Sequence, residues 1–259
     1  MKPFKSLAIV LAGLFYVQYF YSQTIPNENI DDHLKYSKNE LLGRLNPSSP
    51  LFSEVPIMYA SRTGILLRTE VLNAFYDLQQ AAEDEDIELI ILSGTRTFLH
   101  QKSIWDRKWE RPRYMGWDAL DKALDILTYS SMPGTSRHHW GTDIDIIDAN
   151  YPKPKSVLEE ENFYGNGPYC HLKNWMDRYS ESYGFYEVYT KNPNRKGVKY
   201  EPWHFSYAPV SKPMLKEYQK LDIKRILKEE KILGHECFTE EFIVKYKTEN
   251  ILDINPQLF

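Results

Sequence analysis

The sequence predicts an α+β fold built around one globular domain. Some segments carry apolar residues at spacings of three and four, which indicates amphipathic helices, while others alternate or are continuously apolar, which indicates strands. The two kinds of pattern are mixed along the chain. A hydrophobic content of 42% and an aromatic content of 14% in 259 residues are sufficient for a proper core.

The expected elements follow a polar lead-in at residues 23–50. The first predicted helix covers residues 69–83, with Thr69 as candidate N-cap and an acidic run that ends it. Further helices are expected at residues 98–109, 119–127 and 172–179, and strands at residues 87–92, 143–148, 185–189 and 203–207. The loop at residues 149–167 is rich in Pro, Asn and Gly, and we expect it to form a rim or lid over a cleft.

The two ends of the chain differ in composition from its middle. Residues 1–22 combine two early lysines, an apolar run and a small residue, which is typical of a cleaved secretory signal peptide. The alternative is an uncleaved anchor, and residues 1–22 would then contact the membrane. Both alternatives place the globular part outside the cytoplasm, in the periplasm or at the cell envelope. Residues 211–259 predict a helical C-terminal extension that either packs on the domain or docks a partner.

Charge and cysteine content limit the partners and the covalent links. A net charge of −4 and a pI near 6.0 give no basic field for phosphates, so nucleic acid is excluded as a partner. Cys170 and Cys237 form an even pair in an exported chain. A disulfide and two buried free thiols are equally compatible with this pair.

Metal-ligand chemistry is concentrated in residues 136–145 and 201–204. His138 and Asp145 are separated by seven positions, and Asp145 falls in a predicted strand. Zinc binds neutral imidazole and carboxylate together, and a catalytic site needs three such ligands with a fourth position open. His204 offers the third ligand, and Glu201 beside it is a candidate general base. The adjacent His139 is an alternative to His138 that spacing alone does not exclude.

A candidate cation lies at the end of another strand. Arg96 follows Gly94 just after the predicted buried strand at residues 87–92, where it would project into a cleft. If this motif is considered by itself, the alternative is that Arg96 forms an ion pair with an acidic residue at the surface.

These motifs resemble the zinc signature of the VanY-type D-alanyl-D-alanine carboxypeptidases, which belong to the M15 family of peptidoglycan metallopeptidases. The resemblance covers roughly residues 51–208 and rests on four motifs in order. They are Ser93-Gly94-Thr95-Arg96-Thr97 followed by Gln101, Ser136-x-His138-x-x-Gly141-x-x-x-Asp145, the segment from Trp175 to Phe185, and Glu201-x-Trp203-His204. The sequence departs from the family pattern at Thr95, where an aromatic residue is common, and at Thr142-Asp143, which replaces a usually apolar pair.

The resemblance implies a zinc peptidase domain at residues 51–210, with a small, mainly antiparallel sheet that bears the Zn2+ site and is flanked by helices. The implied site consists of His138, Asp145 and His204 as zinc ligands, Glu201 as general base and then proton donor, and Arg96 as the cation that stabilises the tetrahedral intermediate. Ser136, Gln101, Trp203 and Asp143 are the expected substrate-binding residues.

The function implied by the resemblance is hydrolysis of the terminal D-Ala-D-Ala bond of peptidoglycan stem peptides. An endopeptidase on the same scaffold is one alternative, and a non-catalytic, zinc-stabilised module that binds wall peptides is another. Glu201 and Arg96 favour an enzyme, because a purely structural metal site needs neither a free carboxylate nor a facing cation.

Overall fold

The computed structural model describes residues 35–46 and 48–259, so the predicted signal peptide at residues 1–22 lies outside the described part. The helices and strands are α1 (Lys38–Leu41), β1 (Phe52–Glu54), β2 (Leu66–Arg68), α2 (Thr69–Glu83), β3 (Leu89–Ser93), α3 (Phe98–Trp109), α4 (Ala119–Leu127), β4 (Asp143–Asp148), α5 (Cys170–Tyr179), β5 (Phe185–Glu187), β6 (His204–Tyr207), α6 (Ala208–Tyr218), α7 (Ile223–Glu229) and α8 (Glu240–Tyr246). Helices and strands are mixed along the chain, which confirms the α+β class.

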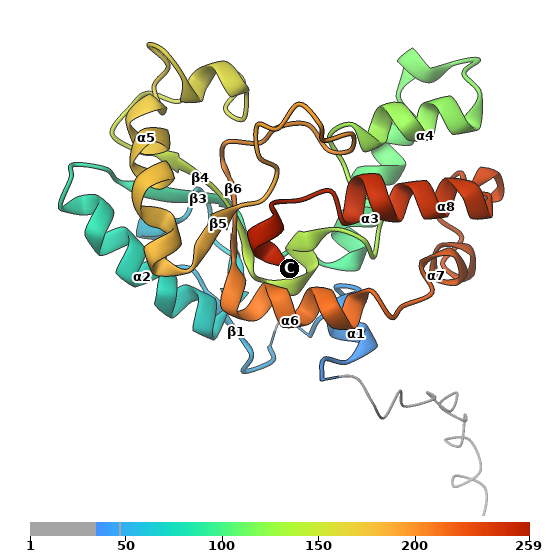
Figure 1. Cartoon of the computed structure of the whole chain (residues 1–259), viewed down its shortest axis with the longest axis horizontal. Helices are drawn as coiled ribbons and strands as arrows, with labels where there is room; N and C mark the ends of the chain where they lie inside the picture. Colours follow the sequence, from blue (N-terminus) through green and yellow to red (C-terminus); the bar gives the residue numbers. More distant parts are fainter. Residues whose placement is uncertain (1–34, 47) are drawn as a thin grey trace, which may run out of the picture. The chain divides into compact units, whose positions relative to one another are not determined.

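The main sheet has four strands in the order β3-β4-β6-β5, and every neighbouring pair is antiparallel. Strands β1 and β2 form a separate antiparallel pair. Helices flank the main sheet: α2 and α5 lie beside it, while α3, α4, α7 and α8 gather at the other end of the domain (Figure 1). The predicted antiparallel sheet flanked by helices is therefore confirmed.

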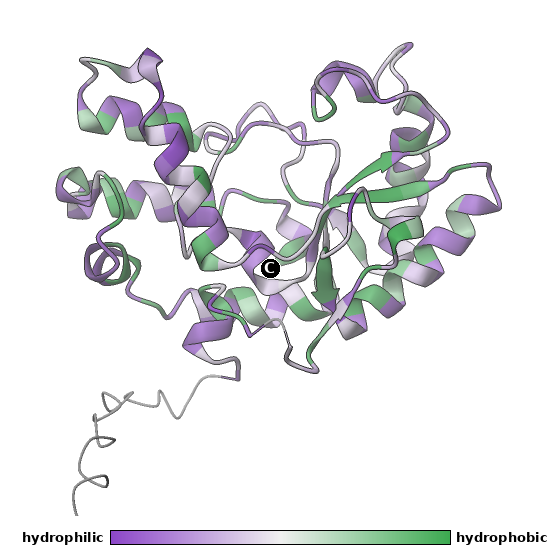
Figure 2. Cartoon of the chain, turned by 180° about the vertical axis from the view of Figure 1, so that it is seen from behind, coloured by the Kyte–Doolittle hydropathy of each residue, from purple (hydrophilic) through white to green (hydrophobic). Residues whose placement is uncertain are grey.

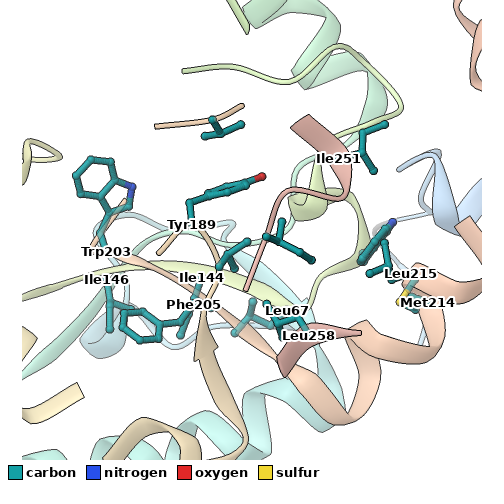
Figure 3. Close-up of a cluster of buried hydrophobic side chains, with 14 of the residues drawn as sticks. Leu67, Ile144, Ile146, Tyr189, Trp203, Phe205, Met214, Leu215, Ile251 and Leu258 are labelled. Atoms are coloured by element: carbon teal, nitrogen blue, oxygen red, sulfur yellow. The ribbon is translucent and has the colours of Figure 1, made fainter. Parts of the chain in front are cut away.

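The two central strands of this sheet separate an apolar face from a polar face. On β4, Ile144 and Ile146 alternate with aspartates, and Ile144 lies directly opposite Phe205 of β6. The three apolar side chains belong to one buried cluster (Figure 3), and apolar residues of the sheet are coloured green in Figure 2. Because side chains alternate along a strand, Asp143 and Asp145 must point to the opposite face.

The predicted boundaries match the structure to within a few residues. The helices at residues 98–109 and 119–127 and the strand at residues 143–148 have the bounds of α3, α4 and β4. The N-cap of α2 was predicted wrongly, since Arg68 is the cap and Thr69 is the first helical residue. The Thr69 hydroxyl instead lies 2.9 Å from the hydroxyl of Ser53 on β1, a strand that the sequence pattern did not reveal.

The described part of the lead-in contributes to the main core. Leu41 and Leu42 are fully buried, and the carbonyl of Leu41 accepts a hydrogen bond from Trp140 Nε1 at 3.1 Å. The Glu40 carboxylate binds the buried guanidinium of Arg68 at 2.9 Å. Residues 35–46 are thus part of the fold rather than a polar segment that precedes it.

The C-terminal extension packs on the domain, as one of the two alternatives predicted. The side chains of Met214, Leu215 and Leu258 are buried in the cluster of Figure 3. The extension also holds two loops beside the sheet. Tyr218 donates a hydrogen bond to the carbonyl of Gly134 at 2.8 Å, and the Asp253 carboxylate accepts from the backbone N–H groups of residues 196 and 197.

Two further expectations concern cysteines and membrane segments. Cys170 and Cys237 are free thiols, so the disulfide alternative is not formed. Across residues 35–46 and 48–259, no helix has the length and apolar character needed to cross a bilayer.

Candidate functional site

The register of β4 against β6 brings two of the predicted ligands together. Asp145 lies directly opposite His204, and strand alternation places both on the polar face of the sheet. His138 comes from a 3₁₀ turn, Arg137–Trp140, just before β4. Gly141 ends this turn with a φ of 70°, and a Cβ there would lie 2.7 Å from the ring of Phe52. The glycine therefore serves both the left-handed conformation and the close packing that aim His138 at β4.

His138, Asp145 and His204 are buried, and their ligand atoms lie within 4.8 Å of one another. The Nδ1 atom of His138 is 2.9 Å from the carbonyl oxygen of Gly94, which leaves Nε2 facing the carboxylate of Asp145 at 3.4 Å. The Nδ1 atom of His204 lies 3.9 Å from the other oxygen of Asp145. One nitrogen of each ring and the carboxylate thus converge on a common point, so the three residues form a possible metal site.

The electrostatics of the cluster favour positive charge at this point. Burial raises the pKa of the Asp145 carboxyl, but His138, His204 and Arg96 together outweigh burial and lower it. Burial lowers the pKa of His204, yet hydrogen bonds with Asp143 and Glu201 outweigh burial and raise it to about 10. A divalent cation would supply the same positive charge in place of a proton.

The donor set also fits zinc chemically. The Asp145 Oδ1 atom is buried and has no hydrogen-bond partner among the described residues. An orphaned buried carboxylate oxygen is costly unless a cation or donor reaches it. Two imidazole nitrogens and one carboxylate oxygen are a three-ligand set that zinc accepts in sites with an open fourth position.

Glu201 and Arg96 lie beside these ligands. The Glu201 carboxylate is mostly buried, and its Oε2 is 2.8 Å from Nδ1 of His204. The guanidinium of Arg96 donates to Gln101 Oε1 at 3.0 Å and to Ser93 Oγ at 3.1 Å. Burial lowers the pKa of Arg96, while the carboxylates of Asp145 and Glu201 oppose this effect. The arrangement holds a cation and a free carboxylate at fixed positions around the possible metal site.

These groups line one cavity of about 440 Å³. Its lining includes all five predicted catalytic and ligand residues, together with Tyr189 and the loop residues Tyr129, Ser130, Ser131, Leu158, Glu159 and Val198. Leu158 and Glu159 come from the loop predicted to form a rim, and both lie at the cavity. Tyr189 packs its ring edge-on to that of His204, with centroids 5.1 Å apart. Trp203 lies on the same side of the buried hydrophobic cluster as Tyr189 (Figure 3).

The structure divides the four predicted substrate-binding residues into two groups. Ser136 and Trp203 line the cavity. Gln101 and Asp143 are fully buried and are not part of its lining. Gln101 lies behind Arg96 and donates to the carbonyl of Ser131 at 2.7 Å. Gln101 and Asp143 therefore lie beneath the cavity, and neither side chain is exposed to a substrate bound in it.

Three residues of the site were missed or left undecided by the sequence. Arg137 and Tyr189 line the cavity, although only the position of Arg137 inside the histidine motif could have drawn attention to it. His139 is fully buried, accepts at Nε2 from Gly134 N at 3.0 Å and donates at Nδ1 to the carbonyl of Arg96 at 2.6 Å. Burial lowers its pKa to about 3 against the opposing effect of the hydrogen bond that it donates to the Arg96 carbonyl, so its ring is neutral. His139 thus fixes the backbone of Arg96.

Fold and site together are those of an α+β protein with a candidate hydrolytic metal centre. The family model of VanY, described as D-alanyl-D-alanine carboxypeptidase, matches residues 64–210, which is more than half of the 259 residues. The chain belongs to the VanY family, and the predicted resemblance is confirmed.

Curated relatives support this membership over different lengths. A D-alanyl-D-alanine carboxypeptidase of Enterococcus faecalis is 28% identical over 156 residues, or 60% of this chain and 53% of the relative. The chain thus spans about half the length of that relative. The putative carboxypeptidase YodJ of Bacillus subtilis is 28% identical over 203 residues, which are 78% of this chain and 67% of the relative.

A solved structure shares the fold. The structure of the LD-carboxypeptidase LdcB, described as revealing the molecular basis of peptidoglycan recognition, matches with a TM-score of 0.50 and 22% identity. The match covers 76% of this chain and 79% of that chain. The family model ends at residue 210, so the C-terminal extension lies beyond the matched domain.

Proposed function

We propose that the protein is a zinc metallopeptidase that hydrolyses the terminal D-Ala-D-Ala bond of peptidoglycan stem peptides. The observation that carries this proposal is the convergence of His138, Asp145 and His204 with Glu201 and Arg96 in one cavity. Membership of a family described as D-alanyl-D-alanine carboxypeptidase supports the choice of bond.

The proposed metal ligands are Nε2 of His138, Nδ1 of His204 and the carboxylate of Asp145. A zinc ion held by them supplies Lewis-acid polarisation of the scissile carbonyl and a lower pKa for the attacking water. The protein supplies the geometry, because all three side chains are buried and come from adjoining strands and a glycine-terminated turn.

Glu201 and Arg96 perform the proton transfer and charge stabilisation in this proposal. Glu201 takes a proton from the attacking water and returns it to the nitrogen of the departing alanine. The guanidinium of Arg96 faces the same cavity and stabilises the negative charge that develops on the carbonyl oxygen. Gln101 and Ser93 hold this guanidinium in place, so little reorganisation is needed during the reaction.

The substrate contacts that we propose are Ser136 and Trp203, because both line the cavity beside the metal ligands. The serine hydroxyl offers a hydrogen bond to the carboxylate of the terminal alanine, and the indole ring offers an apolar wall. We place this action on the assembled wall, outside the cytoplasm, which agrees with the secretory pattern in residues 1–22.

Mass spectrometry of defined muropeptides tests the proposed reaction. The zinc-loaded protein should remove one alanine from a pentapeptide stem that ends in two D-alanines, and should leave the tetrapeptide stem intact. Two internal fragments would identify an endopeptidase on the same scaffold. Intact peptides throughout would contradict the proposed activity and favour a wall-peptide-binding module.

A further inference from the structure

Asp143 is a buried carboxylate that lies beneath His204, at the position where the sequence departs from the apolar pair usual in the family. Its side chain is fully buried and does not line the cavity. It accepts hydrogen bonds from His204 Nε2 at 3.0 Å, Arg137 Nε at 2.9 Å, Ser206 Oγ at 2.6 Å and Thr142 Oγ1 at 2.7 Å. Removing a carboxylate from water is costly unless it is paired and hydrogen-bonded. Four donors, one of which is the Arg137 guanidinium, meet that condition here.

The sheet itself builds this arrangement. In the register of β4 against β6, Asp143 lies opposite Ser206 and Asp145 lies opposite His204. Residues two apart on a strand share a face, so all four side chains point to the same side. Asp145 and His204 line the cavity and are two of the candidate metal ligands, while Asp143 and Ser206 lie beneath them. The contact from Asp143 to His204 is the diagonal contact between the two pairs.

This diagonal contact determines which nitrogen of His204 is available to a metal. The Nε2 atom donates to Asp143, so Nδ1 is the atom that faces Asp145 and Glu201. A histidine that binds a metal commonly donates its other N–H to a carboxylate, which fixes the tautomer and orientation of the ring and makes the ligand more basic. His138 has only a neutral backbone carbonyl, that of Gly94, in the equivalent place.

Arg137 and Ser206 hold the carboxylate in turn. The guanidinium of Arg137 is buried, stacks on the Trp140 ring at 4.9 Å, and donates through Nη2 to the Ser206 hydroxyl at 2.7 Å. Ser206 then donates to the Oδ1 atom of Asp143. Asp143 is therefore restrained at both oxygens, and its hydrogen bond to a proposed metal ligand is the one with His204.

We propose that Asp143 is a positioning residue that fixes the tautomer and ring orientation of His204, and that Arg137 and Ser206 restrain it for this role. The inference rests on the proposed zinc site and replaces the substrate contact expected of Asp143. With zinc bound, Asp143 and His204 would form a carboxylate–histidine–metal triad with the ion, at a motif position where the family usually has an apolar residue.

The test is the zinc affinity of the full-length Asp143→Asn variant, measured by competition with a chromophoric chelator. The expected loss is about 10–100-fold relative to the wild-type protein. Asp148→Asn is the matched control, because Asp148 is a buried carboxylate on the same strand whose Oδ1 binds only the backbone N–H groups of Glu88 and Asn150. Its zinc affinity should equal that of the wild type.

A second readout is the long-range ¹H–¹⁵N NMR spectrum of the histidine rings in the zinc-loaded protein. The wild-type spectrum should show His204 with its proton on Nε2, and Asp143→Asn should weaken or broaden that signal. Ser206→Ala, which removes one donor to the carboxylate, is the milder variant to use if Asp143→Asn does not fold. A loss of zinc affinity of about tenfold, the lower end of the range above, is expected.

The outcomes separate this inference from the proposed function. Zinc affinity within threefold of wild type in Asp143→Asn, or in Ser206→Ala when only that variant folds, would overturn the positioning role and leave the proposed function standing. An equal loss in Asp148→Asn would also overturn it, since the effect would then be general to buried carboxylates of β4. A wild-type protein that binds no zinc would overturn both.

Discussion

Replacing Glu201 by glutamine removes one carboxylate charge while keeping the shape of the side chain. The carboxylate lies 2.8 Å from His204 and lines the cavity, and a glutamine can still form a hydrogen bond there. Among the cavity-lining residues that the structure describes, Asp145 and Glu159 are the other carboxylates, and Asp145 is assigned to the metal. Glu201 is therefore the cavity-lining carboxylate that contacts a proposed ligand without being assigned to the metal, which isolates it as the candidate base.

The expected loss follows from this isolation. A positioned general base contributes about 10²–10⁴-fold to a rate, which corresponds to about 3–5 kcal/mol of activation free energy. We expect Glu201→Gln to lower kcat for D-alanine release by this factor, with zinc content near one ion per chain and little change in the unfolding temperature. The assay is D-alanine release from a pentapeptide stem, with the metal content measured by inductively coupled plasma mass spectrometry.

Glu159→Gln is the matched control, since it makes the same substitution in another carboxylate of the same cavity. It should keep kcat within a few-fold of the wild type. Near-native kcat in Glu201→Gln would refute the assignment of Glu201 as the general base. A variant that has lost its zinc would show that the carboxylate acts on the metal site instead.

Three further predictions concern the metal, the C-terminal extension and a half-buried amine. Removing metal with a chelator should abolish activity and lower the unfolding temperature, and zinc should restore both. Zinc at about 1,000 times its Kd stabilises the folded state by about 4 kcal/mol, which explains the change in unfolding temperature. Full activity in the chelated protein would contradict the metal site. Gly197→Ala should destabilise the protein by about 2 kcal/mol or more in urea unfolding, because the added Cβ would lie 1.6 Å from the carbonyl oxygen of Glu249. Gly64→Ala has open space and should cost less, about 1 kcal/mol, from the strain of its φ of 77° alone; equal costs would contradict the tight packing of the extension. Lys108→Met should be more stable than the wild type at pH 7. Burial, and after it Arg111, lowers the pKa of Lys108 to about 8. Below that pH the folded wild type must keep a partly buried charge that the variant lacks. Between pH 8 and about 10.5 the unfolded chain binds the proton that the folded chain releases, so wild-type stability gains on the variant and the difference in urea unfolding should shrink; a difference independent of pH would contradict the shift.

Local patterns in the sequence were sufficient for the long elements of the fold. The bounds of α3, α4 and β4 follow from apolar spacing and alternation, which depend on the chain itself. The pairing of β1 with β2 and the burial of Leu41 and Leu42 depend on distant residues, so they leave no periodic signal. Short elements that are stabilised by tertiary contacts are therefore the part that the sequence could not predict.

The candidate site shows the same division between local and distant information. Alternation along β4 correctly placed Asp143 and Asp145 on one face, but only the register against β6 shows that Asp145 lies at the cavity and Asp143 beneath it. The choice between His138 and His139 likewise depends on distant partners, because the ring of His139 is bound to Gly134 and Arg96. The roles of these residues in binding and catalysis stay predictions until variants are measured.

Anomalous diffraction at the zinc edge, from crystals of the zinc-loaded protein, tests the central claim most directly. The account predicts one peak about 2.0–2.2 Å from Nε2 of His138, Nδ1 of His204 and a carboxylate oxygen of Asp145. A peak at other residues, a peak at Nε2 of His204, or no peak in the cavity would contradict it.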